Sequence, residues 1–224
     1  LFSNCNVLCN TSSLFRSYPN SIWQGIKLEG GGINFSNVTI QGATKGLNLN
    51  NLTNDLKISN CTFDNLNQDL TINGYVFNNI TDNGRIYHNH FTPTGNNAPI
   101  QIWVLNTNYI NIDNNYMNST KWTGIALLNC NMPLVKNNSI EGVNAAQEIG
   151  IVSYLSGGTY SCNTVTNCYE GIVLDNSSPV LYQNTVHTNG VGMSLTNNSY
   201  PIMSPAVLNN ETINLAGYNH FYNN

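Results

Sequence analysis

The chain has 224 residues, of which only 8% are charged and 41% hydrophobic, and its net charge is −4. This hydrophobic content excludes a disordered chain, and the absence of a basic run excludes nucleic acid as a partner. No window approaches the roughly 18 apolar residues of a membrane span, so we expect no membrane-spanning segment. Asn supplies roughly a fifth of the residues, and it disfavours helices because its side chain competes for backbone hydrogen bonds.

The first 21 residues follow no regular pattern and hold Cys5 and Cys9, so we expect an irregular start or a partial N-terminal cap. From residue 22 to residue 224, pairs of apolar residues enclosing one outward residue recur, which is strand periodicity. The pairs expected to point inward are Ile26 and Leu28, Leu47 and Leu49, Leu70 and Ile72, Ile100 and Ile102, Ile125 and Leu127, Ile151 and Ser153, Ile172 and Leu174, and Met193 and Leu195.

These pairs recur at steps of about 21 to 30 residues, which is typical of a solenoid because one unit cannot bury its apolar face alone. A leucine-rich repeat would need a Leu-dominated core and usually a helical return segment. The units here mix Ile, Val, Leu, Phe and Tyr and return through polar turns such as residues 175–179. We therefore predict an all-β parallel β-helix of about eight to nine coils.

A second strand phrase lies between successive apolar pairs and usually begins with Asn. In a parallel β-helix, equivalent residues stack from coil to coil, and a buried amide is satisfied by its copy in the next coil. The sequence therefore predicts an inward hydrogen-bonded ladder of Asn89, Asn114, Asn138, Asn163 and Asn184. The longest step lies between Leu70 and Ile100, so we expect a loop around residues 79–97 to leave the stack.

Residues 23–26 (Trp-Gln-Gly-Ile), 40–43 (Ile-Gln-Gly-Ala) and 46–49 (Gly-Leu-Asn-Leu) resemble the right-handed parallel β-helix repeats of secreted bacterial proteins. The resemblance covers about residues 22–195. It implies the fold of pectin-lyase-like proteins but no single activity, because this architecture serves lyases, hydrolases, epimerases, tailspikes and adhesins. The first of these stretches, which begins with Trp23, is similar to repeats in exported surface proteins of Bacteroidota-type bacteria. The resemblance implies a secreted or cell-surface location, and with no recognisable C-terminal cap we expect a segment of a longer chain.

The sharpest candidate binding site consists of Arg85, His88, His90 and Asp113. His88 and His90 are expected to face outward on one coil, with Asp113 in the place of His88 on the next. Imidazoles beside a carboxylate can bind a metal or polarise a sugar hydroxyl. The alternative is an ordinary exposed polar column, which we favour, and we expect no metal and no cofactor.

Catalytic residues are not evident. Glycoside hydrolysis needs two carboxylates roughly 5 to 9.5 Å apart. The candidate pairs do not recur in outward columns of adjacent coils; they are Asp64 with Asp69, Glu141 with Glu148, and Glu170 with Asp175. The basic residues are scattered singly, which disfavours a uronate lyase. The six cysteines are interpreted as structural, and a disulfide between Cys162 and Cys168 stays open.

Two functions remain in view. The first is a non-catalytic structural module of a secreted or cell-surface protein, such as a stiff spacer, an adhesin segment or a fibre-forming unit. The second is a carbohydrate-binding or polysaccharide-degrading protein of lyase or hydrolase type. A polysaccharide or further copies of the chain are the expected partners, and an outward apolar column of Ala126, Val152 and Val173 indicates a face that is covered or oligomeric.

Overall fold

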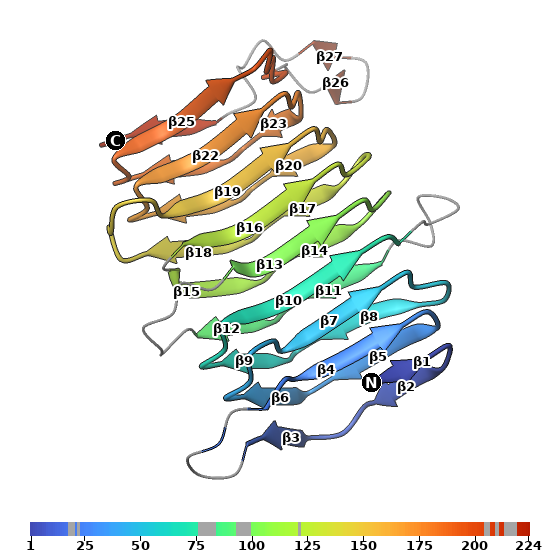
Figure 1. The fold of residues 1–224 in the computed structure, drawn as a ribbon. Helices are drawn as coiled ribbons and strands as arrows, with labels where there is room; N and C mark the ends of the chain where they lie inside the picture. The colour runs from blue at the N-terminus through green and yellow to red at the C-terminus, as the bar shows by residue number, and fades with distance from the viewer. Residues whose placement is uncertain are drawn as a thin grey trace.

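The computed structural model describes residues 1–17, 21, 23–75, 84–92, 100–120, 122–203, 207–208, 211–212 and 219–224. In this part of the chain the regular structure is entirely β-strand, and no described segment forms a helix long and apolar enough to cross a membrane. The strands wind around one axis as a right-handed parallel β-helix of about eight coils (Figure 1). The predicted fold class is confirmed.

Each coil contributes one strand to each of three parallel sheets. Sheet A contains β1 (Phe2–Ser3), β4 (Ile26–Glu29), β7 (Leu47–Asn50), β10 (Gln68–Asn73), β13 (Ile100–Leu105), β16 (Thr123–Leu128), β19 (Ile149–Tyr154), β22 (Glu170–Asp175) and β25 (Val191–Thr196). Sheet B contains β2 (Asn6–Cys9), β5 (Gly32–Ser36), β8 (Leu56–Ser59), β11 (Arg85–Tyr87), β14 (Asn111–Asp113), β17 (Leu134–Lys136), β20 (Thr159–Ser161) and β23 (Val180–Tyr182).

Sheet C contains β3 (Ser13–Arg16), β6 (Val38–Gln41), β9 (Thr62–Asp64), β12 (His90–Thr92), β15 (Tyr116–Thr120), β18 (Ser139–Gly142), β21 (Thr164–Thr166), β24 (Thr185–His187) and β28 (His220–Tyr222). A separate antiparallel pair joins β26 (Val207–Leu208) to β27 (Glu211–Thr212).

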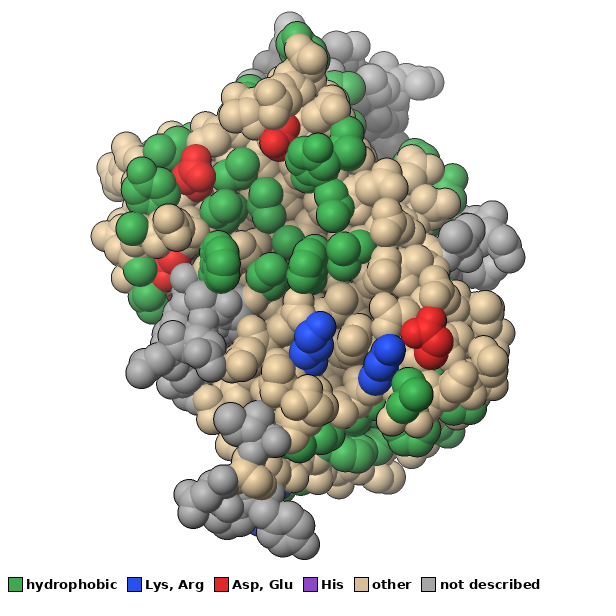
Figure 2. Space-filling view, in the orientation of Figure 1, with side chains coloured by type: hydrophobic (Ala, Val, Ile, Leu, Met, Phe, Trp, Pro, Cys, Tyr) green, Lys and Arg blue, Asp and Glu red, His purple; other side chains and the backbone are tan. Residues whose placement is uncertain are grey.

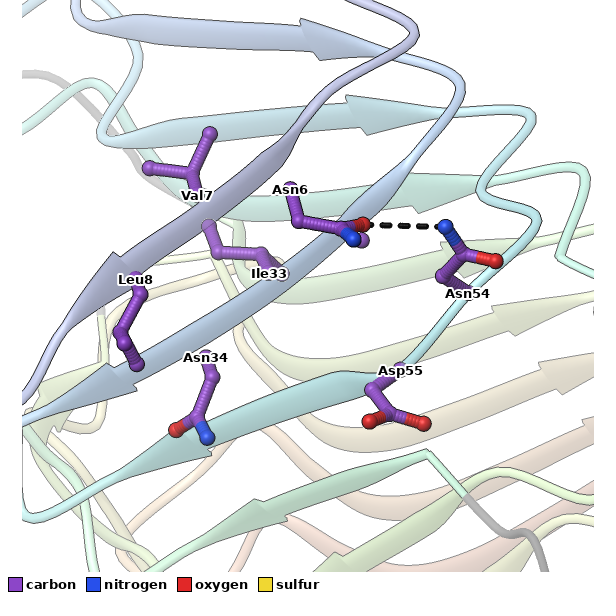
Figure 3. A pocket seen from close by; sticks show the side chains of 8 residues that line it. Asn6, Val7, Leu8, Ile33, Asn34, Asn54 and Asp55 are labelled. Atoms are coloured by element: carbon purple, nitrogen blue, oxygen red, sulfur yellow. Dashed lines mark hydrogen bonds between the residues drawn. The ribbon is translucent and has the colours of Figure 1, made fainter.

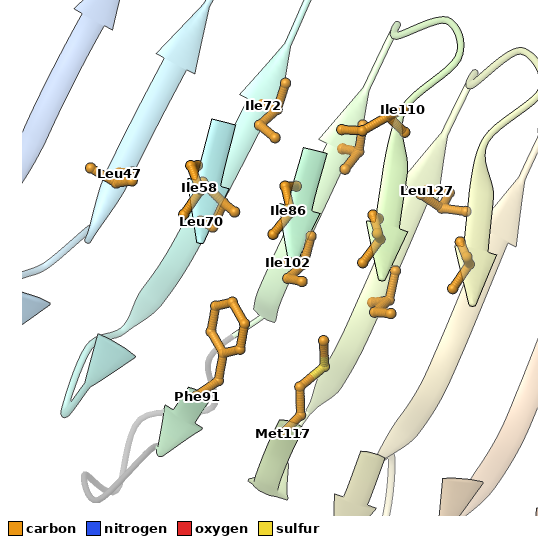
Figure 4. Close-up of a cluster of buried hydrophobic side chains, with 14 of the residues drawn as sticks. Leu47, Ile58, Leu70, Ile72, Ile86, Phe91, Ile102, Ile110, Met117 and Leu127 are labelled. Atoms are coloured by element: carbon orange, nitrogen blue, oxygen red, sulfur yellow. The ribbon is translucent and has the colours of Figure 1, made fainter. Parts of the chain in front are cut away.

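The inward side chains of the three sheets form a continuous apolar core (Figure 4). Like residues stack on like, as Phe63 does on Phe91 with ring centroids 4.8 Å apart. One polar inward residue, Ser153, is explained by the buried Tyr160, whose hydroxyl lies 2.8 Å from the Ser153 hydroxyl. The predicted inward pairs are confirmed from β4 to β22 except in β13. There Ile102 and Val104 are buried, whereas Ile100 faces outward opposite Gln68. In β25, Met193 and Leu195 pair with the inward Ile172 and Leu174, but Leu195 is 47% exposed.

Sheets B and C are joined by a corner of a single residue with positive φ, such as Asn37 at 60° or Asn137 at 54°. Asn adopts this left-handed conformation more readily than other side-chain-bearing residues. The same type of corner holds His88 and Asn114. Asn therefore serves two purposes in this fold, one at the corner and one directly after it in the ladder, and two coils use it for both, at residues 114–115 and 137–138.

The ladder stacks buried amides through the core side of this corner. Asn138 donates its Nδ2 to Asn163 Oδ1 at 3.0 Å, and the Asn138 backbone N–H donates to the same oxygen at 3.1 Å. Its Nδ2 also donates to the carbonyl of Ile112 at 2.9 Å. Equivalent bonds confirm the prediction for Asn89, Asn163 and Asn184, and Asn219 continues the ladder beyond them.

The prediction for Asn114 is wrong, because Asn115 occupies the ladder. Asn115 is 2% exposed and donates to Asn138 Oδ1 at 3.0 Å, whereas Asn114 is the exposed corner residue. With Asn114 inward, alternation would also place Tyr116 inward, but Tyr116 faces outward and Met117 fills the core. Two consecutive asparagines made the two alignments equally acceptable in the sequence.

Two further ladders were not predicted. Between sheets A and B, the backbone N–H of Cys130 donates to Ser156 Oγ, that of Ser156 to Ser177 Oγ and that of Ser177 to Ser199 Oγ. Between sheets C and A, Cys168 N donates to Asn189 Oδ1 and Asn189 Nδ2 donates to Asn224 Oδ1. The recurrence of Ser at sequence separations of 21 and 22 was the available signal.

The structure bears on two further predictions, the irregular N-terminal start and the loop at residues 79–97. Strands β1, β2 and β3 pair in parallel with β4, β5 and β6, so residues 2–16 lie in the same three sheets as the later coils. A domain boundary at residue 21 stays a prediction. Within the predicted loop at residues 79–97, residues 85–92 supply β11 and β12, and residues 79–83 and 93–97 lie outside the described residues.

The sheet A position before the first inward residue points toward the core and is Gly in six of the eight strands from β4 to β25; the exceptions are Asp69 and Gln101. A Cβ at Gly150 would lie 2.2 Å from Val165 Cγ1. In β10 this position is Asp69, which is 1% exposed and whose carboxylate oxygens accept no hydrogen bond from the described part of the chain. Burial, with a smaller contribution from Asp64, raises the pKa of Asp69 well above its usual value.

We predict that Asn138→Leu lowers the free energy of unfolding by roughly 2 to 4 kcal/mol, because it leaves the Asn115 donors and the Ile112 carbonyl unpaired in the core. Thermal and denaturant unfolding measure this effect. Asn34→Leu, at a half-buried outward position of β5, is the matched control and should change stability little. Equal stability of the two variants would contradict the ladder.

Asp69 should make stability depend on pH. The native state keeps the Asp69 proton above the pKa of an unfolded Asp, about 3.9, so the free energy of unfolding is highest below that pH. It should fall by up to about 1.4 kcal/mol per pH unit until the native pKa is passed. Asp69→Asn should remove this slope in denaturant titrations. The exposed Asp55→Asn is the control, and an unchanged slope in Asp69→Asn would refute the assignment.

Candidate functional site

The outer face of sheet B carries a cluster of charged residues on neighbouring coils. Arg85 of β11 lies beside Lys57 of β8, and Asp113 of β14 lies between Tyr87 and Lys136. Three of the seven basic residues of the chain gather here around one carboxylate, so the cluster is locally positive although the whole chain is negative. We call Lys57, Arg85, Tyr87, Asp113 and Lys136 the sheet B cluster.

Asp113 is the buried centre of this cluster and is 6% exposed. Its Oδ2 lies 3.5 Å from Lys136 Nζ and 4.0 Å from Arg85 Nη2. Its Oδ1 accepts hydrogen bonds from Asn114 Nδ2 at 2.6 Å and Asn137 Nδ2 at 3.1 Å. With both oxygens occupied, Asp113 anchors the corners of two coils and is not placed to act as a general base.

Tyr87 lies in contact with two of the cations. Arg85 Cζ is 4.9 Å and Lys57 Nζ is 5.9 Å from the centre of its ring, both within cation–π range. Partial burial on its own would raise the pKa of Tyr87. Hydrogen bonding to Ser59 and Lys57 and the positive charges of Lys57 and Arg85 together outweigh that effect, so its pKa lies below the usual value.

The two histidines do not complete the predicted site. Asp113 lies opposite Tyr87 and not in the place of His88, which on the next coil is taken by Asn114. His88 occupies the exposed corner with its ring edge-on to Tyr87, and His90 lies on sheet C against Tyr116, at a centroid distance of 5.0 Å. Of the four predicted residues, the structure therefore brings Arg85 and Asp113 together. No three His, Cys, Asp or Glu side chains in the described ranges are grouped as metal ligands.

Four of the carboxylates considered as catalytic pairs, those of Asp64, Glu148, Glu170 and Asp175, accept hydrogen bonds from other groups of the chain. Asp64 accepts a hydrogen bond from Gln41 Nε2 at 2.8 Å. Glu148 is buried and accepts the backbone N–H groups of residues 143 and 145; burial still raises its pKa. Glu170 accepts a hydrogen bond from Ser194, and Asp175 accepts one from Asn197. Asp69 differs from these four residues: it accepts no hydrogen bond from the described part of the chain, and the nearby charge of Asp64 contributes to its raised pKa.

All six cysteines are free thiols, so the disulfide considered between Cys162 and Cys168 is not formed. Desolvation raises the pKa of Cys61 and of Cys130 to about 11 and that of Cys168 to about 12. Because the thiolate is the reactive form, these buried cysteines are poor nucleophiles.

A shallow hollow lies on sheet B near the N-terminal coils, over β2 and β5 (Figure 3). It is bordered by Asn6 and Asn54, whose side chains share a hydrogen bond of 3.0 Å, and its volume is about 190 Å³. Small-molecule sites typically enclose roughly 300 to 1,000 Å³. Its far border, Asn34, pairs with Lys57, so the hollow adjoins the sheet B cluster without forming a cleft around it.

Comparison with known families gives one match. The family described as "Right handed beta helix region" matches residues 24–211, which is most of the chain. No curated protein matches the chain. The match agrees with the coils seen in the structure, and it specifies neither a substrate nor a catalytic residue.

We predict that Lys57→Met raises the pKa of Tyr87 toward its ordinary value, because the substitution removes a hydrogen-bond donor and a positive charge beside the phenol. Titration of the tyrosine ring carbons by NMR, with Tyr87→Phe for assignment, measures the change. Lys45→Met removes an exposed lysine elsewhere and serves as the control. A Tyr87 pKa that is unaltered in Lys57→Met would show that the cation does not act on the ring.

Proposed function

We propose that this chain, which belongs to the family of right-handed β-helix regions, serves as a non-catalytic structural module of a secreted or cell-surface protein. Its role would be to hold and display neighbouring segments as a stiff spacer. Membership of the family accounts for the fold, whereas function depends on the surface and the interior of this particular chain.

The main support is the unbroken ladder. Buried amide bonds join successive coils from Asn89 to Asn219, and the backbone N–H of Cys61 donates to Asn89 Oδ1 to extend it by one coil. Each coil contacts mainly its neighbours, as in other solenoids, so the ladder couples their stabilities along the axis. A stack held in this way resists local opening, which is the property that a spacer needs.

The chemistry of the surface also favours a structural role. The candidate carboxylates are engaged in hydrogen bonds or buried, and Asp113 is held by four partners. Three of the six thiols, those of Cys61, Cys130 and Cys168, are buried with raised pKa values and so resist oxidation, which suits a protein outside the cell; Cys162 is exposed. The secreted or cell-surface location rests on this argument and on the resemblance of the repeats.

A second candidate function is the binding of an acidic polysaccharide at the sheet B cluster. The observation that favours it is the convergence of Lys57, Arg85 and Lys136 around an aromatic ring with one carboxylate among them. Cations that exceed the local acids can attract uronate carboxylates, and an aromatic ring can pack against a sugar face.

Turnover and binding assays with polygalacturonate and alginate distinguish these two functions. A structural module should produce neither unsaturated uronate, followed by absorbance, nor new reducing ends from either polymer. If the second function also holds, calorimetry will detect binding that weakens with salt and is lost in a Lys57→Ala, Arg85→Ala double variant but kept in Lys27→Ala, Lys45→Ala. Turnover that disappears in the same double variant would overturn the structural proposal.

A further inference from the structure

The outer face of sheet A is apolar over three consecutive strands, β13, β16 and β19. Figure 2 shows green side chains gathered on this face, with charged side chains only at its borders. Strand pairing aligns its outward residues in three columns: Ile100, Thr123 and Ile149; Trp103, Ala126 and Val152; and Leu105, Leu128 and Tyr154. We call these nine residues the apolar face.

The apolar face is flat and built on regular paired strands, so its shape does not depend on a loop. Tyr154 is 42% exposed, and the neighbouring Trp122 and Leu155 are 52% and 45% exposed. Contiguous apolar surface of this kind on a soluble domain marks an interaction site. Nothing in the sheet B cluster reaches it, because the two sheets face different directions (Figure 1).

We propose that the apolar face binds a second copy of this chain, with the two β-helices antiparallel and a twofold axis running along β16. This inference does not depend on whether the sheet B cluster binds a glycan. The occupant follows from the self-complementarity of the face, since a twofold interface must present the same patch to itself.

The twofold axis along β16 pairs every apolar residue with an apolar partner. It places Trp103 opposite Val152 of the second copy, and Ala126 opposite its own copy. In the outer columns it pairs Ile100 with Ile149 and Leu105 with Tyr154. The largest side chain of the central column thus never faces itself, and the smallest lies on the axis. Alternation of large and small residues lets two sheets interdigitate at about 10 Å.

Charge distinguishes this arrangement from a parallel one. The antiparallel dimer places Glu170 and Asp175 of β22 opposite Gln68 and Asn73 of β10, so each carboxylate faces an amide. A parallel dimer, with the axis along the solenoid, would place Glu170 opposite Asp175 and Trp103 opposite Trp103. Like charges in contact and two stacked bulky rings both oppose that alternative.

The size of the face sets the expected affinity. The interface includes the three strands of the apolar face and the flanking strands β10 and β22. Five strands about 4.8 Å apart and six residues long, at about 3.3 Å per residue, give a projected area of about 480 Å². A standard interface buries about 800 Å² per partner. An interface of this size belongs to the weak, transient class, so the dimer should dissociate on dilution.

Sedimentation velocity of the full chain from submicromolar to high micromolar concentration tests the proposal. The mass should rise from monomer to dimer in the parent, and Val152→Asp should stay monomeric throughout. Thr164→Asp, at an outward and likewise half-buried position on sheet C, is the matched control and should dimerise as the parent does. A parent that stays monomeric, or a Val152→Asp variant that dimerises equally well, would overturn the proposal.

Introducing a positive or a negative charge at residue 68 tests the orientation and leaves the apolar residues unchanged. Gln68→Lys should tighten the antiparallel dimer several-fold, because each lysine faces Glu170 of the other copy, and Gln68→Glu should weaken it by a similar factor. In the parallel arrangement residue 68 faces Asn73, so both changes would leave the dissociation constant unaltered. That result would overturn the antiparallel arrangement.

Discussion

The structure depends on one shared acceptor in each coil from Asn89 to Asn219. The ladder oxygen of each Asn accepts the side-chain and backbone N–H groups of the Asn before it, while its own Nδ2 donates to a backbone carbonyl. These groups are buried, so none can exchange its partner for water without loss of stability. The requirement places each coil in exact register with the next, and the apolar core is stacked by the same register.

Register also organises the outer surface. Residues one coil apart in the sequence become direct neighbours, so outward residues of successive coils line up in columns. On sheet B this produces a cationic cluster from basic residues that look isolated along the chain. On sheet A it produces an apolar face from residues that each form an ordinary outward position. Each of these two surfaces is therefore built from one to three residues per coil.

The errors in the candidate site share one cause. Placing Asn114 in the ladder shifted that coil by one residue, and the same shift put Asp113 beside His88. With Asn115 in the ladder, Asp113 lies opposite Tyr87 and close to Arg85 and Lys136. The corner between sheets B and C is one residue in the left-handed conformation, so inward and outward alternation cannot be counted through it.

The sequence alone was sufficient to predict the fold class, the coil length and nearly all inward residues, because the coils of a solenoid recur in the sequence with a regular period. It was also sufficient for four of the five predicted ladder residues. Tertiary structure decided which asparagine of the pair at 114 and 115 is buried, which cations surround Asp113, and that Asp69 takes the place of a core-facing glycine. These outcomes depend on backbone conformation at corners and on contacts between coils, which residue spacing does not record.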